Sequence, residues 1–288
     1  MRTPTAADDV YVTSRDGTRI GALRRGQGPG ILLVQGAMGT AHTYDQLSQA
    51  LSSHFTVYAL DRRGRGLSPR PYEQQHTIAR DVEDIDVFLE HTGSSFVYGL
   101  SSGAVITLEA TRTLPRITRA AVYEPPFYRD GISLEGVRRL NAEIERGDLP
   151  AALVTSLLTS GTAPAPLRLL PRPAARTLAA LVLAVDARKA PSEQRLQDLL
   201  PGIRYDFNAV AGQDGRMSTF ASIEAPMLLL GGTKSPAFLR QAIRDLAETL
   251  PQATLVELEG LDHAGSWNSA RGDGPERVAS QLKDFFTG

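Results

Sequence analysis

The sequence contains no cysteine among its 288 residues. Disulfide bonds, a cysteine nucleophile and cysteine-ligated zinc are therefore excluded. A surplus of either charge is also missing, since 31 Lys and Arg stand against 32 Asp and Glu. Nucleic acids and anionic membranes attract a basic surplus, so we expect neither as a partner.

Long apolar runs are missing too. No segment approaches the ~20 apolar residues that a membrane-spanning helix needs. Residues 1–9 have no apolar centre, so we expect no signal peptide and a cytoplasmic location. A length of 288 residues suits one large domain, or one domain that carries an insertion.

Short apolar segments alternate with amphipathic ones along most of the chain. Strands are predicted at 10–13, 19–23, 31–34, 55–60, 96–98, 120–123, 226–230 and 253–258, and helices at 44–51, 77–90, 104–110, 237–250 and 275–286. The first two strands flank Asp16-Gly17, a dipeptide typical of hairpin turns. The alternation that follows predicts an α/β fold with a mostly parallel central sheet flanked by helices.

The alternation stops after residue 124. The segment up to about residue 222 is rich in Leu, Ala, Arg and Pro, and prolines at 164, 166, 171, 173, 191 and 201 divide it into short helices. We predict a helical cap, residues 127–222, inserted into a core domain formed by residues 1–126 and 223–288. The cap offers a contact surface for a second copy of the chain, although the sequence leaves the oligomeric state open.

The residues Gly99-Leu100-Ser101-Ser102-Gly103 stand between a predicted strand and a predicted helix. Strand, Gly-x-Ser-x-Gly, helix is the context of a nucleophile elbow, in which the central serine projects above the sheet. Glycines suit the tight turn because side chains there would crowd Ser101. The alternative is an ordinary strand-to-helix turn that contains serines, and the flanking elements favour the elbow.

A serine hydroxyl needs a nearby base to act as a nucleophile at neutral pH. His263 lies in a glycine-flanked loop, residues 259–265, directly after the last predicted strand. Loops at the carboxyl ends of parallel strands line the ligand crevice, so His263 is the predicted base. The remaining histidines precede the elbow and are predicted to be surface or helix-capping residues: His42, His54, His76 and His91.

These features together resemble the α/β-hydrolase superfamily over almost the whole chain. The resemblance rests on the elbow, the turn at 35–39, the loop at 61–66, the Gly231-Gly232 strand end and the late histidine loop. It implies the α/β-hydrolase fold with an inserted cap and the chain order nucleophile, acid, histidine. It implies no metal and no organic cofactor.

The acid departs from the common pattern of that superfamily. Most relatives have an aspartate just past the strand that ends at Gly231-Gly232, where this chain has Ser235. Glu124 follows the strand after the elbow helix, and zearalenone-type lactonases are similar in pairing a Gly-x-Ser-Ser-Gly-Ala elbow with a glutamate there. We therefore predict Glu124 as the acid, against the alternative of a solvated glutamate at a strand end. Asp262 adjoins the base and is predicted to have a structural role.

An oxyanion hole uses two backbone N–H groups. One is predicted from Ser102, directly after the nucleophile, and the other from the turn after the strand at 31–34. Ala37 is the predicted donor in that turn and Gly36 the alternative. The side-chain amide of Gln35 is expected to hold the turn by hydrogen bonds.

The predicted reaction is acyl transfer from a carboxylic ester to water through an acyl-enzyme on Ser101. Apolar side chains near the site suggest a small hydrophobic ester or lactone, and the resemblance favours a macrolactone. The candidate substrate contacts, for which core packing is the alternative, are Met38, Phe127, Tyr128 and Trp267. A carbon–carbon bond hydrolase or a thioesterase remains an alternative on this scaffold. The serine at position 235 favours a further alternative, in which the protein is a non-hydrolytic binding protein, a cyclase or a lyase.

Overall fold

The computed structural model describes residues 7–69, 73, 76–190, 194–268 and 274–288. Residues 1–6, which bear on the predicted lack of a signal peptide, lie outside the described residues, as does Pro191.

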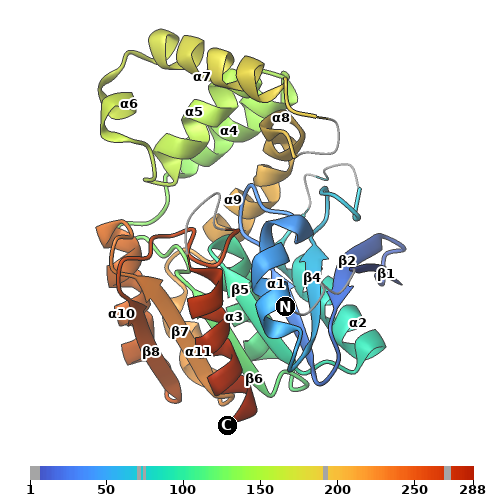
Figure 1. The fold of residues 1–288 in the computed structure, drawn as a ribbon. Helices are drawn as coiled ribbons and strands as arrows, with labels where there is room; N and C mark the ends of the chain where they lie inside the picture. The colour runs from blue at the N-terminus through green and yellow to red at the C-terminus, as the bar shows by residue number, and fades with distance from the viewer. Residues whose placement is uncertain (1–6, 70–72, 74–75, 191–193, 269–273) are drawn as a thin grey trace.

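An eight-stranded sheet runs through these ranges in the order β1-β2-β4-β3-β5-β6-β7-β8 (Figure 1). Its strands are β1 (Asp8–Thr13), β2 (Arg19–Arg25), β3 (Gly30–Val34), β4 (Thr56–Asp61), β5 (Phe96–Leu100), β6 (Arg119–Tyr123), β7 (Met227–Gly232) and β8 (Ala253–Leu258). The strand β2 is antiparallel to β1 and β4, and every other neighbouring pair is parallel. This confirms the predicted mostly parallel sheet.

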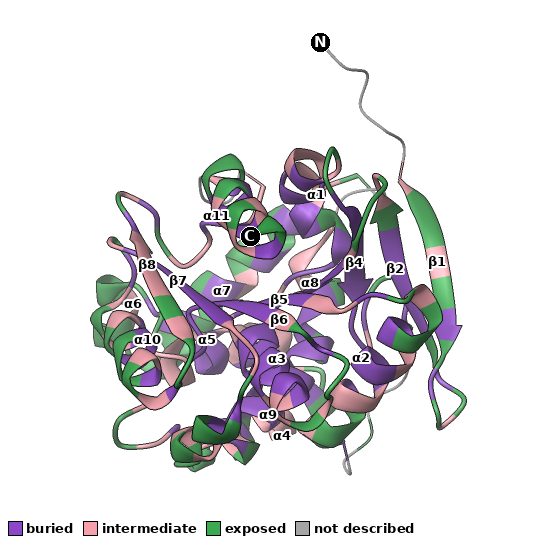
Figure 2. Ribbon diagram, turned by 90° about the horizontal axis from the view of Figure 1, so that it is seen from below, coloured by how far each residue is buried: buried purple, intermediate pink, exposed green. Residues whose placement is uncertain are grey.

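Helices cover both faces of the sheet, as Figure 2 shows with the strands near edge-on. One face carries α1 (Asp45–Leu51), preceded by the short helix η1 (Ala41–Tyr44), and α11 (Pro275–Thr287); the other carries α2 (Ile78–Thr92), α3 (Ser102–Thr113) and α10 (Ala237–Thr249). The strands β3 to β7 are buried on both faces, which explains their near-continuous apolar sequences, whereas the edge strand β8 is mostly half-buried.

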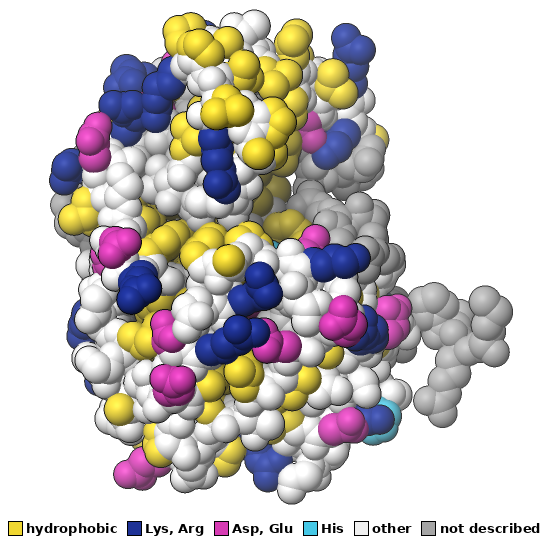
Figure 3. Space-filling view, turned by 90° about the vertical axis from the view of Figure 1, so that its left-hand side faces the viewer, with side chains coloured by type: hydrophobic (Ala, Val, Ile, Leu, Met, Phe, Trp, Pro, Cys, Tyr) yellow, Lys and Arg dark blue, Asp and Glu magenta, His cyan; other side chains and the backbone are white. Residues whose placement is uncertain are grey.

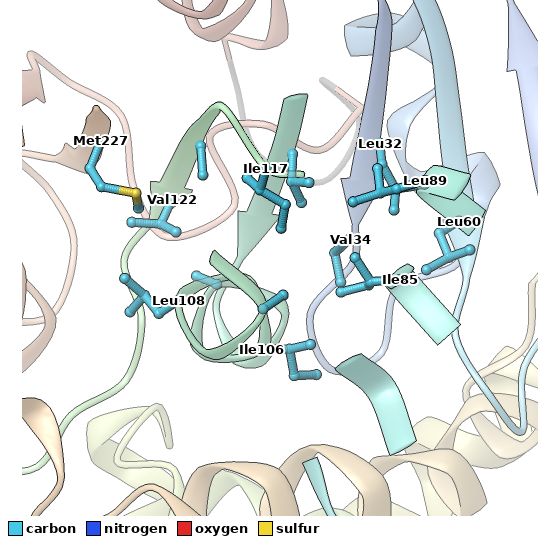
Figure 4. Packing of buried hydrophobic residues seen from close by; sticks show 14 of the residues in the cluster. Leu32, Val34, Leu60, Ile85, Leu89, Ile106, Leu108, Ile117, Val122 and Met227 are labelled. Atoms are coloured by element: carbon cyan, nitrogen blue, oxygen red, sulfur yellow. The ribbon is translucent and has the colours of Figure 1, made fainter. Parts of the chain in front are cut away.

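Successive strand residues point to opposite faces and so enter two separate cores. In Figure 4, side chains from β3, β4 and β6 meet α2 and α3, with Met227 of β7 at the edge of the view: Leu32, Val34, Leu60, Ile85, Leu89, Ile106, Leu108, Val122 and Met227. The intervening strand residues Ile31, Leu33, Tyr98 and Leu228 pack on the opposite face with α1 and α11. The core therefore holds the strand ends, and the loops that follow them, in fixed positions.

The segment between β6 and β7, residues 127–222, contains helices and no strand within its described residues. Its helices are α4 (Leu134–Glu145), α5 (Leu149–Thr159), α6 (Ala165–Leu169), α7 (Arg172–Asp186), α8 (Leu196–Leu199), η2 (Leu200–Gly202), α9 (Ile203–Gly212) and η3 (Met217–Ser222). Figure 1 places α4 to α8 above the sheet, with α9 between them and α3. Ser133 and Asp148 cap α4 and α5, as polar residues at helix starts do. We call residues 127–222 the helical segment; its division from the core as a domain stays a prediction.

The outer surface of the helical segment exposes several large apolar side chains. Figure 3 shows hydrophobic side chains gathered over this upper part of the molecule, with Lys and Arg side chains around them, and acidic and basic side chains interspersed over the part below. The exposed large apolar residues of α6 and α7 and the turn between them are Leu169, Leu170, Leu178, Leu181, Val182 and Val185. Within the described part of the chain, no helix is both long and apolar enough to cross a membrane.

Candidate active site

Three predicted residues follow strands of the parallel part of the sheet. Ser101 comes directly after β5 and Glu124 directly after β6, and these strands pair side by side with Leu100 opposite Tyr123. His263 lies in the loop after β8. Because the carboxyl ends of parallel strands meet at one edge, the three side chains come from the same edge of the sheet.

Ser101 forms the turn between β5 and α3 in a backbone conformation that non-glycine residues rarely adopt, with φ 57° and ψ −124°. Its N–H donates to the Tyr123 carbonyl at 2.9 Å, and its own carbonyl accepts from Ala104 and Val105 at 2.9 and 3.2 Å. A Cβ on Gly99 would lie 2.3 Å from Thr107 Oγ1, so no larger residue fits before the turn. The strain at Ser101 is therefore held by the packing of α3 against β5, as an elbow requires.

Glu124 is completely buried and bonded through both carboxylate oxygens. Its Oε1 accepts from the Gly232 N–H at 2.7 Å, and its Oε2 lies 2.8 Å from His263 Nδ1. A carboxylate only accepts hydrogen bonds, so His263 Nδ1 is the donor and Nε2 is the ring nitrogen left for another partner. Glu124 also has a positive φ of 46°, a second strained residue at this edge.

Position 235, where the resemblance to α/β-hydrolases leads to the expectation of an acid, holds no carboxylate. Ser235 is buried, and its Oγ has no hydrogen-bond partner among the described residues. Asp262 takes part in closing the histidine loop, since its Oδ1 accepts from the Ala264 N–H at 2.9 Å and its carbonyl accepts from Tyr123 Oη at 2.7 Å. The carboxylate on the imidazole is thus that of Glu124.

Two backbone N–H groups beside Ser101 lack a protein acceptor within the described residues, those of Ala37 and Ser102. Ser102 begins α3, where the first N–H groups of a helix have no partner in the helix. Ala37 lies in a turn in which Gly39 N–H donates to the Gly36 carbonyl at 3.3 Å. A Cβ on Gly36 would be 2.9 Å from Ser101 Cβ, so this turn lies directly against the serine.

The prediction for the Gln35 side chain is wrong. Its amide is fully buried, yet neither Oε1 nor Nε2 has a hydrogen-bond partner among the described residues. The turn is held through its backbone instead: Arg62 Nη1 donates to the Gln35 carbonyl at 3.4 Å, and Arg65 Nη1 donates to the Gly36 carbonyl at 2.9 Å. The two guanidinium groups thus do what was predicted for the Gln35 amide. A guanidinium suits this role because it carries several N–H donors in a rigid, planar arrangement.

These arginines belong to a buried ionic cluster that sequence reasoning missed. Arg62 bonds Asp81 at 3.0 Å and Asp206 at 2.6 Å, and Arg65 also pairs with Asp206. Burial alone raises the pKa of Asp81, but Arg62 and then His76 outweigh it, so this pKa lies below its usual value. The predicted surface or helix-capping role is wrong for His76, which is buried with Nε2 2.8 Å from Asp81. The signal for the cluster was the loop at 61–66, whose partners are far away in the sequence.

A cavity of about 410 Å³ opens beside Ser101 and His263. Its walls include the predicted contacts Met38 and Trp267 together with Ala37, Leu157, Ile203 and Phe207. Tyr128 lines a smaller cavity of about 60 Å³ that shares Ser101, Ser160 and Phe207 with the first. Both cavities are lined mainly by apolar residues, together with several hydroxyl groups. The larger cavity is also lined by Lys234 and Asp262, and the smaller one by Asp206.

The structure does not support the predicted substrate contact for Phe127. Its ring packs 5.9 Å from that of Phe220 and against the core, and it lines neither of these two cavities. Phe207 and the hydroxyls of Ser160 and Thr162 line both cavities, although no motif in the sequence marked them. In the described ranges, no group of three or more His, Asp or Glu side chains is arranged to hold a metal ion.

Known proteins share the fold of this chain. A solved alpha/beta hydrolase from Sphaerobacter thermophilus DSM 20745 superposes with a TM-score of 0.76 and 32% identity, over 96% of this chain and 100% of that one. The 2-(acetamidomethylene)succinate hydrolase of Mesorhizobium japonicum is 25% identical over 83% of each chain. The polyketide synthase ThaQ of Burkholderia thailandensis is 26% identical over 86% of this chain, which spans only 11% of that protein.

The family model described as "Alpha/beta hydrolase family" matches residues 31–281, which include every strand from β4 to β8 and the elbow. The sheet order, the elbow and the likeness to the Sphaerobacter enzyme agree with that match. The chain belongs to the alpha/beta hydrolase family.

Proposed function

We propose that this hydrolase cleaves carboxylic esters through an acyl-enzyme on Ser101. The observation that carries the proposal is the hydrogen bond of 2.8 Å between His263 Nδ1 and the fully buried Glu124 carboxylate, in a loop that shares a cavity with Ser101. This bond leaves Nε2 of His263 to take the serine proton. A base oriented by a carboxylate is what a serine nucleophile requires.

In the proposed reaction, Ser101 Oγ attacks the ester carbonyl while His263 Nε2 accepts its proton. Glu124 stays ionised and stabilises the imidazolium. The N–H groups of Ala37 and Ser102 donate to the oxyanion of the tetrahedral intermediate. His263 then protonates the leaving alkoxide, and water repeats the sequence on the acyl-enzyme to release the acid and free Ser101.

We propose a hydrophobic lactone or other hydrophobic ester as the substrate. The lining of the larger cavity supports this choice, because Met38, Phe207 and Trp267 present large uncharged, mostly apolar side chains to it. The volume of about 410 Å³ lies in the range of small-molecule sites. The alternative is a smaller acyclic substrate. The similarity to the 2-(acetamidomethylene)succinate hydrolase, whose name gives an acyclic substrate, supports this alternative.

The test combines a fluorophosphonate probe with a substrate panel. We expect the probe to label the wild-type protein at Ser101, and we expect Ser101→Ala to lose labelling and about 10⁶-fold of the turnover of 4-nitrophenyl esters. Macrolactones, short and long acyl esters and acyclic amides compared by kcat/KM distinguish the substrate classes. A wild-type protein that neither labels nor turns over any of them would favour a binding role in place of catalysis.

A further inference from the structure

The ionic cluster beside the elbow contains two guanidinium groups and two carboxylates, all with side chains at most 3% exposed. Its members come from three distant parts of the chain: Arg62 and Arg65 from the loop after β4, Asp81 from α2, and Asp206 from α9. Burying four charged groups carries a large desolvation penalty. The mechanism proposed above uses none of them directly.

Asp206 is the residue that joins this cluster to the elbow. One oxygen, Oδ1, accepts both from Ser102 Oγ at 2.6 Å and from Arg62 Nη1 at 2.6 Å. The other oxygen, Oδ2, accepts from Arg65 Nη2, and Arg65 also donates to the Gly202 carbonyl at 3.1 Å. A single carboxylate from the helical segment therefore contacts Ser102 and both arginines.

The arginines in turn fix the peptide planes of the turn at 35–39. In a trans peptide, the carbonyl of one residue and the N–H of the next point in opposite directions. Because Arg65 holds the Gly36 carbonyl, the Ala37 N–H points away from Arg65. Arg62 acts in the same way on the Gln35 carbonyl and hence on the Gly36 N–H.

We propose that Asp206 is a positioning residue for the oxyanion hole. It orders both halves of the hole at once, the Ala37 N–H through Arg65 and the Ser102 N–H through the Ser102 hydroxyl. The inference rests on the proposed ester hydrolysis, because only a reaction with an oxyanion needs these two donors. It also gives α9 a direct connection to the chemistry, so the helical segment contributes to the rate as well as to the cavity.

The neighbouring residue Arg63 provides a matched control within the same loop. Its guanidinium is also buried, but it bonds Asp84 at 2.6 Å and Asp16 at 2.6 Å and contacts neither the turn nor the elbow. Asp84→Asn removes a carboxylate from a buried arginine as Asp206→Asn does. Only the latter should change the oxyanion hole.

The experiment measures 4-nitrophenyl butyrate hydrolysis and the inhibition constant of butylboronic acid, whose adduct with a serine places a hydroxyl in the oxyanion hole. For Asp206→Asn we expect kcat to fall about 10- to 100-fold, less than the loss of one oxyanion donor, with KM within about threefold of wild type. The boronate should bind more weakly by a similar factor. Asp84→Asn should retain kcat and boronate affinity, even if its melting temperature falls as much.

Ser102→Ala serves where Asp206→Asn does not fold, since it keeps the backbone N–H and removes only the hydroxyl. We expect it to lower kcat and boronate affinity together, with little effect on KM. The positioning role would be overturned if Asp206→Asn had the same kcat and boronate affinity as Asp84→Asn. Where Asp206→Asn does not fold, the same comparison is made between Ser102→Ala and Asp84→Asn. Either result would leave the proposed ester hydrolysis standing. A wild-type chain that is inert toward both the ester and the fluorophosphonate probe would overturn the proposed function and this inference with it.

Discussion

Glu124 illustrates what decides the role of one residue in this molecule. A glutamate at the end of β6 is free to point into solvent, yet here it is buried and bonded by the Gly232 N–H and by His263. The bond to Gly232 comes from the end of β7, the strand after which the resemblance to α/β-hydrolases predicted the acid. Burial with two donors at fixed positions holds the carboxylate in one orientation, which is what a triad acid needs.

We expect Glu124→Gln to lower kcat for 4-nitrophenyl butyrate by about 10⁴-fold, because an amide neither stabilises an imidazolium nor selects the correct tautomer. Steady-state kinetics on the folded variant provide the measurement. Ser235→Ala is the control, and its kcat should stay near that of wild type because its hydroxyl bonds no described residue. A glutamine variant with wild-type kcat would show that another group supplies the acid.

At the level of elements, α7 has two very different faces. Leu183 faces inward and is 8% exposed, whereas Leu181 is 61% exposed on the outer surface. Its prolines at 171 and 173 stand at the start of the helix, where a missing N–H is tolerated. The predicted division of this region by prolines is therefore realised as helix starts.

Substitution of Leu183 and of Leu181 by alanine should distinguish the buried face of α7 from its exposed face. Leu183→Ala should lower the free energy of unfolding by about 2–4 kcal/mol through lost burial and a residual cavity. Leu181→Ala, the control, should change it by at most about 0.5 kcal/mol. Urea denaturation followed by circular dichroism measures both, and similar losses at the two positions would contradict the inward packing of α7.

Across the whole molecule, the charged groups matter through buried clusters rather than through net charge, which is −1. The cluster of Arg62, Arg65, Asp81 and Asp206 joins α2, α9 and the loop after β4. Breaking a buried ion pair leaves an uncompensated charge, so loss of the Asp81 charge at low pH should destabilise the fold.

The lowered pKa of Asp81 sets the sign of that sensitivity. A carboxyl whose pKa is lower in the folded than in the unfolded state stabilises the fold above the unfolded value, about 3.9, and this contribution is lost as pH falls through the folded pKa. We expect wild type to exceed Asp81→Asn in unfolding free energy at neutral pH by about 3–5 kcal/mol, and the difference to shrink below about pH 4.

Denaturant titrations of both proteins between pH 7 and pH 2 give this difference directly. The difference is the appropriate quantity because burial raises the pKa values of Asp61 and Asp84, whose contributions run in the opposite direction in both proteins. A gap that stays constant over the whole pH range would show that Asp81 does not titrate in the way its contacts imply.

The sequence by itself determined the sheet, the elbow and the histidine loop, because these follow from local patterns. Alternation of apolar strands and amphipathic helices predicts a mostly parallel sheet covered on both faces, and glycines at fixed spacing predict the sharp turn at Ser101. It also pointed to Glu124, since the absence of an acid near Ser235 left few carboxylates at the right edge of the sheet. Family membership was accessible on the same grounds.

Only the tertiary structure decided how the turn at 35–39 is held. The prediction for Gln35 rested on its place in the chain, whereas the actual donors, Arg62 and Arg65, become neighbours only when β4 pairs with β3. Asp206 and Phe207 line the site from α9, about a hundred residues after the elbow in the sequence. Phe127, in contrast, packs against the core and does not line the site. Contacts between residues far apart in sequence depend on packing and side-chain direction, which no local spacing records.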